Sequence, residues 1–267
     1  MGILNVTPDS FSDGGDFFSP DAALRQAQRM IDEGADIIDV GGESTRPGAA
    51  AVSVEEELRR VIPVIEAIHA QFPVIISIDT RKPEVMRAAV RAGAGMVNDV
   101  SALRTDGAVA AAAELEVPVC LMHMQGEPQT MQNEPHYEDV VDEVKDFLLR
   151  RVAVCEKAGI PRRRLIIDPG FGFGKTLTHN LALLRYLPVL AATGLPVLVG
   201  VSKKSMIGAI LDASVDERLM GSVALAALAV WQGAAIIRAH DVMATADAVT
   251  VVDAVRKSKI KSENLVK

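Results

Sequence analysis

The chain has 267 residues, with 28 lysine and arginine against 35 aspartate and glutamate side chains, and a formal net charge of −7. An acidic chain of this kind lacks the basic face of a general nucleic-acid-binding protein, so we expect no nucleic-acid partner. Hydrophobic residues make up 49% and charged residues 24%, a balance typical of a folded globular protein that excludes extensive disorder. The longest apolar run, at residues 223–231, is far shorter than the roughly 20 residues that cross a bilayer, so we expect no membrane partner.

The cysteines and the first residues both favour a cytoplasmic location. Cys120 and Cys155 are too few and too far apart for a CxxC metal site, and we expect them to be buried thiols. Residues 1–6 lack the basic start and the small-residue cleavage site of a secretory signal.

Short runs rich in valine and isoleucine alternate with segments of helical period along the whole chain. The expected strands lie near residues 2–5, 36–40, 74–79, 95–99, 117–123, 164–168, 196–202 and 235–240. The expected helices cover residues 20–33, 53–71, 83–92, 106–114, 137–157, 180–192, 217–231 and 245–257. Every strand is thus followed by a helix, which predicts an α/β protein with a single-domain (β/α)8 TIM barrel over residues 1–257. An open doubly wound sheet leaves a similar pattern and remains the alternative. Residues 258–267 are polar, and we expect a frayed tail.

Polar side chains stand at the carboxyl end of every expected strand. They belong to Asn5, residues 41–48, Asp79, Asn98 and Asp99, His123, Asp168, residues 202–205, and Arg238 with His240. In a barrel of parallel strands these ends share one face, which is the face that carries the active site. The set therefore predicts an active site rather than a collection of unrelated helix caps.

The positively charged members of this set predict an anionic substrate. They are Arg46, Lys203, Lys204, Arg238 and His240. Arg46, together with Thr45, Asn5 and backbone amides, suits a phosphate or a diphosphate. The alternative for the two lysines is a solvated start of the next helix.

Asp79 and Asp168 each follow an isoleucine-rich run, so each carboxylate is expected just above an apolar floor. Such a carboxylate favours a partner with two adjacent N–H donors, as in an aminopyrimidinone ring, although an arginine of the protein would compete. No histidine-based metal motif accompanies the pair, and any metal is expected to be a hydrated Mg²⁺ shared with substrate phosphates. His123 is either a packing residue or a catalytic one.

Two glycine-rich segments follow strands. Residues 170–176 resemble a nucleotide-binding P-loop, but they have three residues between the outer glycines where that motif has four. The glycines either bring backbone close to a flat ligand, with Phe173 lining the site, or shape a tight turn. Residues 6–16 form a long polar loop after the first strand, and we expect a lid there.

Four segments together resemble the signatures of dihydropteroate synthase. They are residues 2–15 (GILNVTPDSFSDGG), 42–48 (GESTRPG), 168–175 (DPGFGFGK) and 238–242 (RAHDV). The resemblance covers essentially the whole chain. It implies a (β/α)8 barrel, a homodimer, the use of Mg²⁺ and a sulfonamide target. The implied reaction joins 6-hydroxymethyl-7,8-dihydropterin diphosphate to 4-aminobenzoate and releases diphosphate and 7,8-dihydropteroate.

The resemblance also implies roles for individual residues of this chain. Asn5 would hold Mg²⁺ and the diphosphate, whose oxygens would bind Thr45, Arg46, Arg238 and His240. The pterin ring would be bound by Asp79, Asn98 and Asp168, with Lys204 at its carbonyl edge and Met122 and Phe173 packed nearby. The 4-aminobenzoate would lie against Thr45, Pro47 and Ser205, under two mobile loops. The catalytic residues implied are Arg46, Asp79, Lys204, Arg238 and His240.

Two departures and three alternatives accompany the resemblance. Lys203 stands where the family usually has arginine, which exchanges a planar donor for a point charge, and Ala239 replaces a more usual valine. A catalytically silent pterin-binding paralogue and the pterin-binding barrel of corrinoid-dependent methyltransferases are the nearest alternatives. A barrel aldolase would need a Schiff-base lysine inside a strand, whereas Lys204 lies past a strand end.

Overall fold

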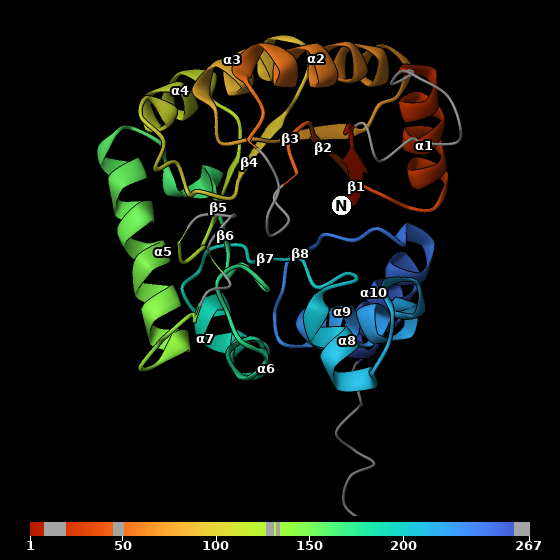
Figure 1. Cartoon of the computed structure of the whole chain (residues 1–267), viewed down its shortest axis with the longest axis vertical. Coiled ribbons are helices and arrows are strands. Elements are labelled where there is room, and N and C mark those ends of the chain that lie inside the picture. Colours follow the sequence, from red (N-terminus) through yellow and green to blue (C-terminus); the bar gives the residue numbers. More distant parts are fainter. Residues whose placement is uncertain (8–19, 45–50, 127–130, 132–133, 259–267) are drawn as a thin grey trace, which may run out of the picture.

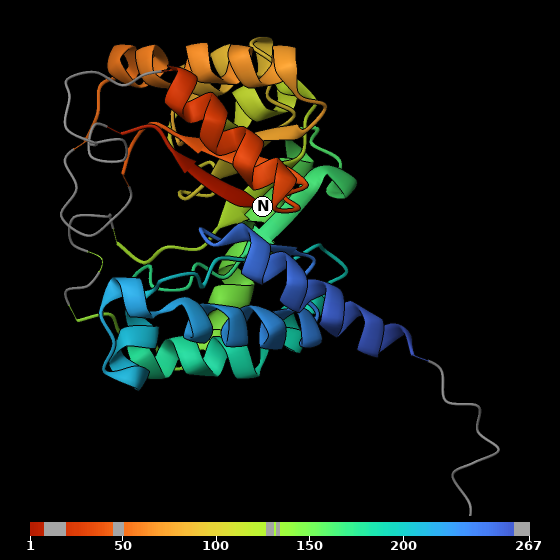
Figure 2. The ribbon, with the colours of Figure 1, turned by 90° about the vertical axis from the view of Figure 1, so that its right-hand side faces the viewer.

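The computed structural model describes residues 1–7, 20–44, 51–126, 131 and 134–258. Within them, parallel strands form an inner barrel and helices form an outer ring (Figures 1 and 2). The elements are β1 Gly2–Asn5, α1 Pro20–Asp32, β2 Ile37–Gly41, α2 Val54–Gln71, β3 Ile75–Asp79, α3 Pro83–Arg91, β4 Met96–Asp99, α4 Ala108–Leu115, β5 Val119–Met122, α5 Val140–Lys157, β6 Leu165–Asp168, α6 Leu177–Arg185, α7 Leu187–Ala191, β7 Leu198–Val199, α8 Ser205–Leu211, α9 Leu219–Trp231, β8 Ile236–Ile237 and α10 Val242–Lys257. No helix in these ranges combines the length and the apolarity needed to cross a bilayer.

The barrel closes through two narrow seams. Strands β1 to β6 pair in sequence order as one parallel sheet, and β7 pairs with β8. A single bridge between Ile167 and Val197 joins β6 to the β7 side, and a second between Gly2 and Ala239 joins β8 to β1. The amide of Ile3 donates to the carbonyl of Ala239 at 3.1 Å. This closed parallel arrangement confirms the predicted (β/α)8 barrel and excludes the open sheet.

The strand side chains that face the barrel interior fall into two layers. Near the amino ends of the strands the layer is apolar and buried, and its core is Met96, Cys120, Ile166 and Leu198. Two residues further along the same strands come Asn98, Met122, Asp168 and Gly200, which line a pocket. Because side chains alternate between the two faces of a strand, each pocket residue stands directly above an apolar one.

The main hydrophobic core lies between the strands and the surrounding helices. Ile38, Ile76 and Leu121 are fully or almost fully buried there on the outward face of the barrel. Both cysteines are free and buried, as predicted. The packed core thus holds the strands from outside, while the inner floor supports the pocket.

Local signals explain where the helices begin and end. The Ser53 hydroxyl accepts the amide of Glu56 at 3.2 Å and caps α2. The single helix expected over residues 180–192 is wrong, because the chain forms α6 and α7 on either side of Tyr186. Pro188, at the start of α7, lacks the amide that would continue the earlier helix. The short helix α8 was not predicted, since seven residues are too few for a clear period.

The expected tail and domain limits stay predictions. Residues 259–267 lie outside the described residues, and Ser258 is the last that the structure describes. The expected lid over residues 6–16 likewise falls largely outside them, because residues 8–19 are not described.

Candidate functional site

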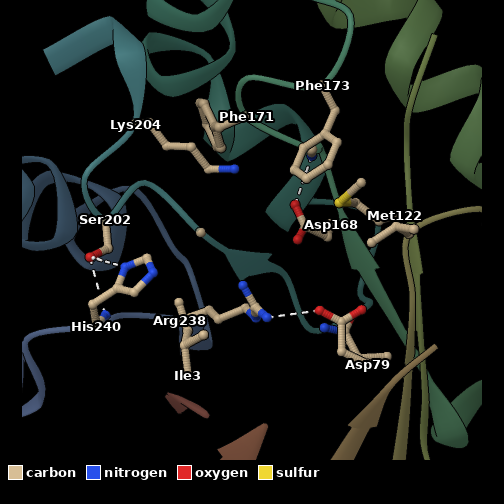
Figure 3. Close-up of a pocket in the computed structure, with 14 residues that line it drawn as sticks. Ile3, Asp79, Met122, Asp168, Phe171, Phe173, Ser202, Lys204, Arg238 and His240 are labelled. Atoms are coloured by element: carbon tan, nitrogen blue, oxygen red, sulfur yellow. Dashed lines mark hydrogen bonds and ion pairs between the residues drawn. The ribbon is translucent and has the colours of Figure 1, made fainter. Parts of the chain in front are cut away.

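A pocket opens at the carboxyl ends of the strands, on the face where the polar residues were expected. Its space is about 500 Å³, including the mouth. It brings together the following residues that were predicted from the sequence: Asp79, Asn98, Met122, Asp168, Phe173, Lys204, Arg238 and His240. Figure 3 shows the side chains of Asp79, Asp168, Lys204 and Arg238 pointing into the same space from different elements.

Arg238 joins two carboxylates at the base of this pocket. From the end of β8, its Nε donates to Oδ2 of Asp39 at 2.6 Å and its Nη2 donates to Oδ2 of Asp79 at 2.8 Å. The amide of Asn98 donates to the same Asp39 oxygen at 3.2 Å. These four side chains come from β2, β3, β4 and the residue after β8, so one polar network spans the barrel interior.

Asp39 was missed by the sequence analysis. It is fully buried, and its Oδ1 has no hydrogen-bond partner in the described part of the chain. It lies in the middle of β2 rather than at its end, so a search of strand ends passed over it. The available signal was an acidic residue within the apolar run of residues 37–40. A charge in such a strand needs a buried partner, which here is Arg238.

Burial and the neighbouring charges shift the pKa values of Asp79 and Arg238 in this network. Burial raises the pKa of Asp79 to about 7; the Arg238 charge opposes the rise, and the Asp39 charge adds to it. Burial opposes the charge on Arg238, but Asp39 and Asp79 outweigh it and raise the pKa of the guanidinium. Two carboxylates therefore compete for one cation that stays protonated.

Asp168 and Lys204 form the opposite side of the pocket. Oδ1 of Asp168 accepts the amide of Gly170 at 2.7 Å, and Nζ of Lys204 lies 4.2 Å from the ring centroid of Phe173. Burial raises the pKa of Asp168 to about 6, against the effects of the Gly170 amide and Lys204. Burial, helped by the charge of Arg238, lowers the pKa of Lys204 to about 8. Phe173 thus stacks beneath a cation that faces the cavity.

His240 is uncharged at neutral pH. Burial, followed by the charges of Arg238 and Lys203, lowers its pKa to about 4. The Ser202 hydroxyl accepts the backbone amide of His240 at 3.1 Å and contacts its Nδ1 at 3.0 Å, which leaves Nε2 for a ligand. Lys203 pairs with Asp241 at 3.2 Å. With its pKa lowered in this way, His240 offers a neutral hydrogen-bonding group rather than the positive charge expected from the sequence.

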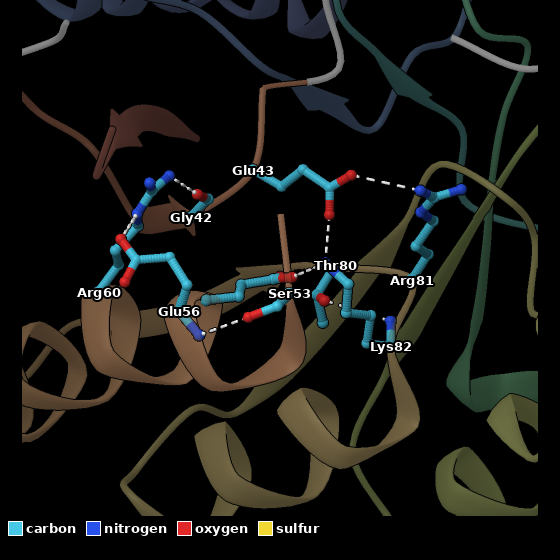
Figure 4. Close-up of polar contacts among 9 residues, drawn as sticks. Gly42, Glu43, Ser53, Glu56, Arg60, Thr80, Arg81 and Lys82 are labelled. Carbon is cyan, nitrogen blue, oxygen red and sulfur yellow. Dashed lines mark hydrogen bonds and ion pairs between the residues drawn. The ribbon is translucent and has the colours of Figure 1, made fainter. Parts of the chain in front are cut away.

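Three expected residues, Thr45, Arg46 and Pro47, lie outside the described residues. The chain on both sides of them is fixed by polar contacts (Figure 4). Glu43 pairs with Arg81 at 3.3 Å and with Lys82, both of which follow the Asp79 strand.

Arg60 of α2 holds Gly42, the residue after β2, to the helix. Its Nη1 donates to the carbonyl of Gly42 at 2.9 Å. Its Nε donates to Glu56 at 2.7 Å. Gly42 and Glu43 are therefore held between α2 and the residues that follow the Asp79 strand.

Asn5 ends β1 near the carboxylates. A Cβ added at Gly41 would stand 3.8 Å from Oδ1 of Asn5 and 3.8 Å from Oδ2 of Asp79, so both oxygens face the space beside this glycine. No group of three or more histidine, cysteine or acidic side chains able to hold a metal occurs among the described residues. The described chain thus offers isolated oxygen ligands rather than a complete metal cage.

The structure also describes two other residues singled out from the sequence. His123 is buried, packs edge-on against Phe147 at 4.8 Å between ring centroids, and has its pKa lowered to about 2 by burial and by Lys175, which supports the packing interpretation. Ser205 is the first residue of α8; it is exposed and is not among the residues that line the pocket.

The glycine-rich segment forms a tight turn. Gly170, Gly172 and Gly174 have φ values of 68°, 79° and 63°, which side chains rarely adopt. A Cβ at Gly170 would stand 1.9 Å from the carbonyl oxygen of His123. The glycines therefore let this loop press against the end of β5, and Gly170 also lines the pocket.

Comparison with known proteins gives consistent matches over nearly the full chain. The family described as "Pterin binding enzyme" matches residues 1–240. The dihydropteroate synthase of Escherichia coli is 57% identical over 259 residues, which cover 97% of this chain and 92% of the relative.

Solved structures agree with this result. The Yersinia pestis dihydropteroate synthase, in a structure with a sulfonamide drug complex, has a TM-score of 0.92 and 51% identity, covering 96% of this chain and 94% of the other. The Xanthomonas albilineans synthase with 4-aminobenzoic acid has a TM-score of 0.92 and 56% identity, covering 97% and 93%. The same enzyme in complex with 7,8-dihydropteroate has a TM-score of 0.88 and 53% identity, with the same coverage.

Proposed function

The chain belongs to the dihydropteroate synthase family of pterin-binding enzymes, and on that premise we propose how its pocket carries out the family's reaction. The reaction joins 6-hydroxymethyl-7,8-dihydropterin diphosphate to 4-aminobenzoate, forming 7,8-dihydropteroate and diphosphate. The observation that carries the proposal is one pocket in which the carboxylates of Asp79 and Asp168 face the cations of Lys204 and Arg238.

The carboxylates and the lysine would bind the pterin ring. Asp79 and Asp168 would each accept N–H donors of the aminopyrimidinone, assisted by Asn98, while Lys204 would donate to the ring carbonyl. Such charge-assisted hydrogen bonds are strongest where water is excluded, and both carboxylates are largely buried. Met122 and Phe173 line the same space and would pack against the flat ring.

Arg238 would exchange one partner when the substrate enters. A pterin that donates to Asp79 competes with the Nη2 of Arg238 for the same carboxylate. The Nε of Arg238 would remain hydrogen-bonded to the buried Asp39. The freed end of the guanidinium would then bind the diphosphate, together with Nε2 of His240, Thr45 and Arg46.

These contacts account for the bond that breaks. Departure of diphosphate from the CH₂ carbon leaves a cation delocalised over the dihydropterin, which the Asp79 carboxylate would stabilise. Arg238, Arg46 and His240 would stabilise the departing anion. The arylamine of 4-aminobenzoate is neutral near pH 7 and attacks the carbon without a strong base, and the proton that its nitrogen then loses passes to the released diphosphate. We place 4-aminobenzoate, and a sulfonamide in its stead, against Thr45, Pro47 and Ser205.

Asn5 would serve a Mg²⁺ ion that enters with the diphosphate. The structure offers an amide oxygen there and no complete cage among its described residues, which fits an ion held mainly by phosphate oxygens and water. When bound, Mg²⁺ would neutralise charge on the leaving group.

We also propose a homodimer formed through the face made by α8, α9 and α10. These three helices expose several large apolar side chains. They include Ile210, Leu211, Met220, Leu228, Trp231, Met243, Val251 and Val255. A second copy of the chain would bury them. Light scattering of the purified protein tests this, and a monomer at micromolar concentration would contradict it.

The decisive experiment incubates the purified protein with hydroxymethyldihydropterin diphosphate and Mg²⁺. It measures the release of diphosphate with and without 4-aminobenzoate. We expect release that depends on the arylamine and yields dihydropteroate. Tight pterin binding without turnover would instead support the silent paralogue.

A further inference from the structure

Lys175 is a buried lysine with no place in the reaction described above. It ends the glycine-rich loop after β6, directly before Thr176, the N-cap of α6, and only 3% of its surface is exposed. Its Nζ lies 2.9 Å from three acceptors: the carbonyls of Gly170 and Phe173, and Nδ1 of His123. An ammonium group has three N–H donors, so all of them are used inside the protein.

This lysine has no ion-pair partner in the described part of the chain. A buried cation without a carboxylate is costly, and burial lowers the pKa of Lys175 to about 7. A methionine would fill similar space without that cost. The hydrogen bonds of Nζ, rather than its charge alone, are therefore the feature that distinguishes lysine at this position.

The acceptors of Lys175 belong to the wall of the pterin pocket. Gly170 and Phe173 both line the pocket, and the Phe173 ring lies beneath Lys204. His123 is neutral, because its pKa is far below 7, so its Nδ1 accepts the ammonium proton. Lys175 thus ties the loop that carries Phe173 to the end of β5.

Other contacts hold the outer part of the same loop. The hydroxyl of Tyr137 donates to the carbonyl of Gly174 at 2.8 Å, and Oδ1 of Asn180 accepts the amide of Gly172 at 2.8 Å. Neither contact reaches Gly170 or Phe173 directly. Oδ1 of Asp168 accepts the amide of Gly170 at 2.7 Å, and Lys175 is the side chain that bonds to the carbonyls of both Gly170 and Phe173 in the part of the loop facing the cavity.

We propose that Lys175, with His123 as its acceptor, is a positioning residue that holds the Phe173 segment in place to bind the pterin ring. The inference rests on the proposed function and adds a specific consequence to it. Although residues 170–176 resemble a phosphate-binding loop, the lysine of this segment serves the ring and makes no contact with the diphosphate. Its loss should weaken every pterin ligand to the same degree, with or without phosphates.

The test uses Lys175→Met in the full chain, which keeps the length of the side chain and removes its three donors. Dissociation constants are measured by calorimetry for 6-hydroxymethylpterin and for its diphosphate with Mg²⁺, next to the KM for 4-aminobenzoate. We expect both pterin ligands to bind about tenfold more weakly, and the KM for 4-aminobenzoate to change less than twofold. Lys145→Met, at an exposed ion pair on α5, is the matched control and should bind as the unmodified protein does.

Two further variants, both at His123, test the same proposal even if Lys175→Met folds poorly. His123→Leu removes one acceptor and should weaken both pterin ligands by a smaller factor, whereas His123→Gln keeps an acceptor and should restore binding. In a Phe173→Leu background, His123→Leu should have little additional effect, because both act through the same ring. A merely structural role would lower the melting temperature without this non-additivity.

Three results would overturn the proposal. One is unchanged pterin binding in folded Lys175→Met and His123→Leu. Another is weaker binding of the diphosphate ligand alone, which would mean that Lys175 serves the phosphates. The third is full additivity of His123→Leu with Phe173→Leu. If the unmodified protein binds no pterin ligand, the proposed function itself fails, and that result is distinct from these three.

Discussion

Replacing Arg238 by methionine should destabilise the protein as well as abolish turnover. The substitution leaves Asp39, which is fully buried, and Asp79, whose side chain is 12% exposed, without the cation they share. Removing one partner of a buried ion pair costs about 3–5 kcal/mol, because the remaining charge has no compensation. For a chain of this size the loss corresponds to a fall of about 10 °C in melting temperature.

The sign of the pH effect gives an independent check. An acid whose pKa is raised in the folded state destabilises the fold above that pKa and has no effect below its unfolded value. The raised pKa of Asp79 therefore predicts a smaller deficit for Arg238→Met at pH 5 than at pH 8.

The assay is thermal unfolding followed by circular dichroism at both pH values, together with turnover. Arg238→Met combined with Asp39→Asn removes one of the two orphaned charges and should regain more than half of the lost stability without regaining activity. Arg29→Met breaks an exposed ion pair with Glu33 and should change stability by less than about 1 kcal/mol. If Arg238→Met melts within 2 °C of the unmodified protein, or shows the same deficit at both pH values, the reasoning is refuted.

Three further predictions concern the other side of the pocket and the metal. Asp168→Asn should raise the melting temperature at pH 8 and weaken pterin binding. The pKa of Asp168 is raised to about 6, so its charged form lowers the stability of the fold above that pH. A melting temperature that gains nothing at pH 8 relative to pH 4 would contradict this. Lys204→Met should lower kcat/KM for the pterin substrate about 10- to 100-fold through loss of a charge-assisted hydrogen bond worth roughly 1.5–3 kcal/mol, and steady-state kinetics measures it. Chelation by EDTA should abolish binding of the pterin diphosphate in calorimetry and leave binding of 6-hydroxymethylpterin unchanged, whereas equal loss of both would place the ion at the ring.

The inner half of the site could be predicted because a parallel barrel imposes a simple arrangement. Both faces of each strand are covered, so the strands read as apolar runs, and a polar residue that ends a run must lie on the common upper face. Asp79, Asn98, Asp168 and Arg238 were found in this way, and they converge in one pocket.

Asp39 and the contacts of Lys175 could not be predicted in this way. Asp39 interrupts an apolar strand, and its partner Arg238 is 199 residues away in the sequence, so only the closed barrel brings them together. Lys175 follows a glycine-rich segment in which the lysine suggests a phosphate, and its burial depends on turns with positive φ. The roles expected for Thr45, Arg46 and Pro47 remain predictions, since these residues lie outside the described part of the chain.

The pairing of β8 with β1 can form only late in synthesis on the ribosome. The amino group of Met1 bonds to the carbonyl of Ile237, which lies 236 residues later. Synthesis at roughly 5–20 residues per second means that β1 waits on the order of ten seconds or more for its second neighbour. During that time it presents an unpaired edge of the kind that other chains can join. Dilute refolding should therefore favour the native barrel, while crowded nascent chains should associate through β1.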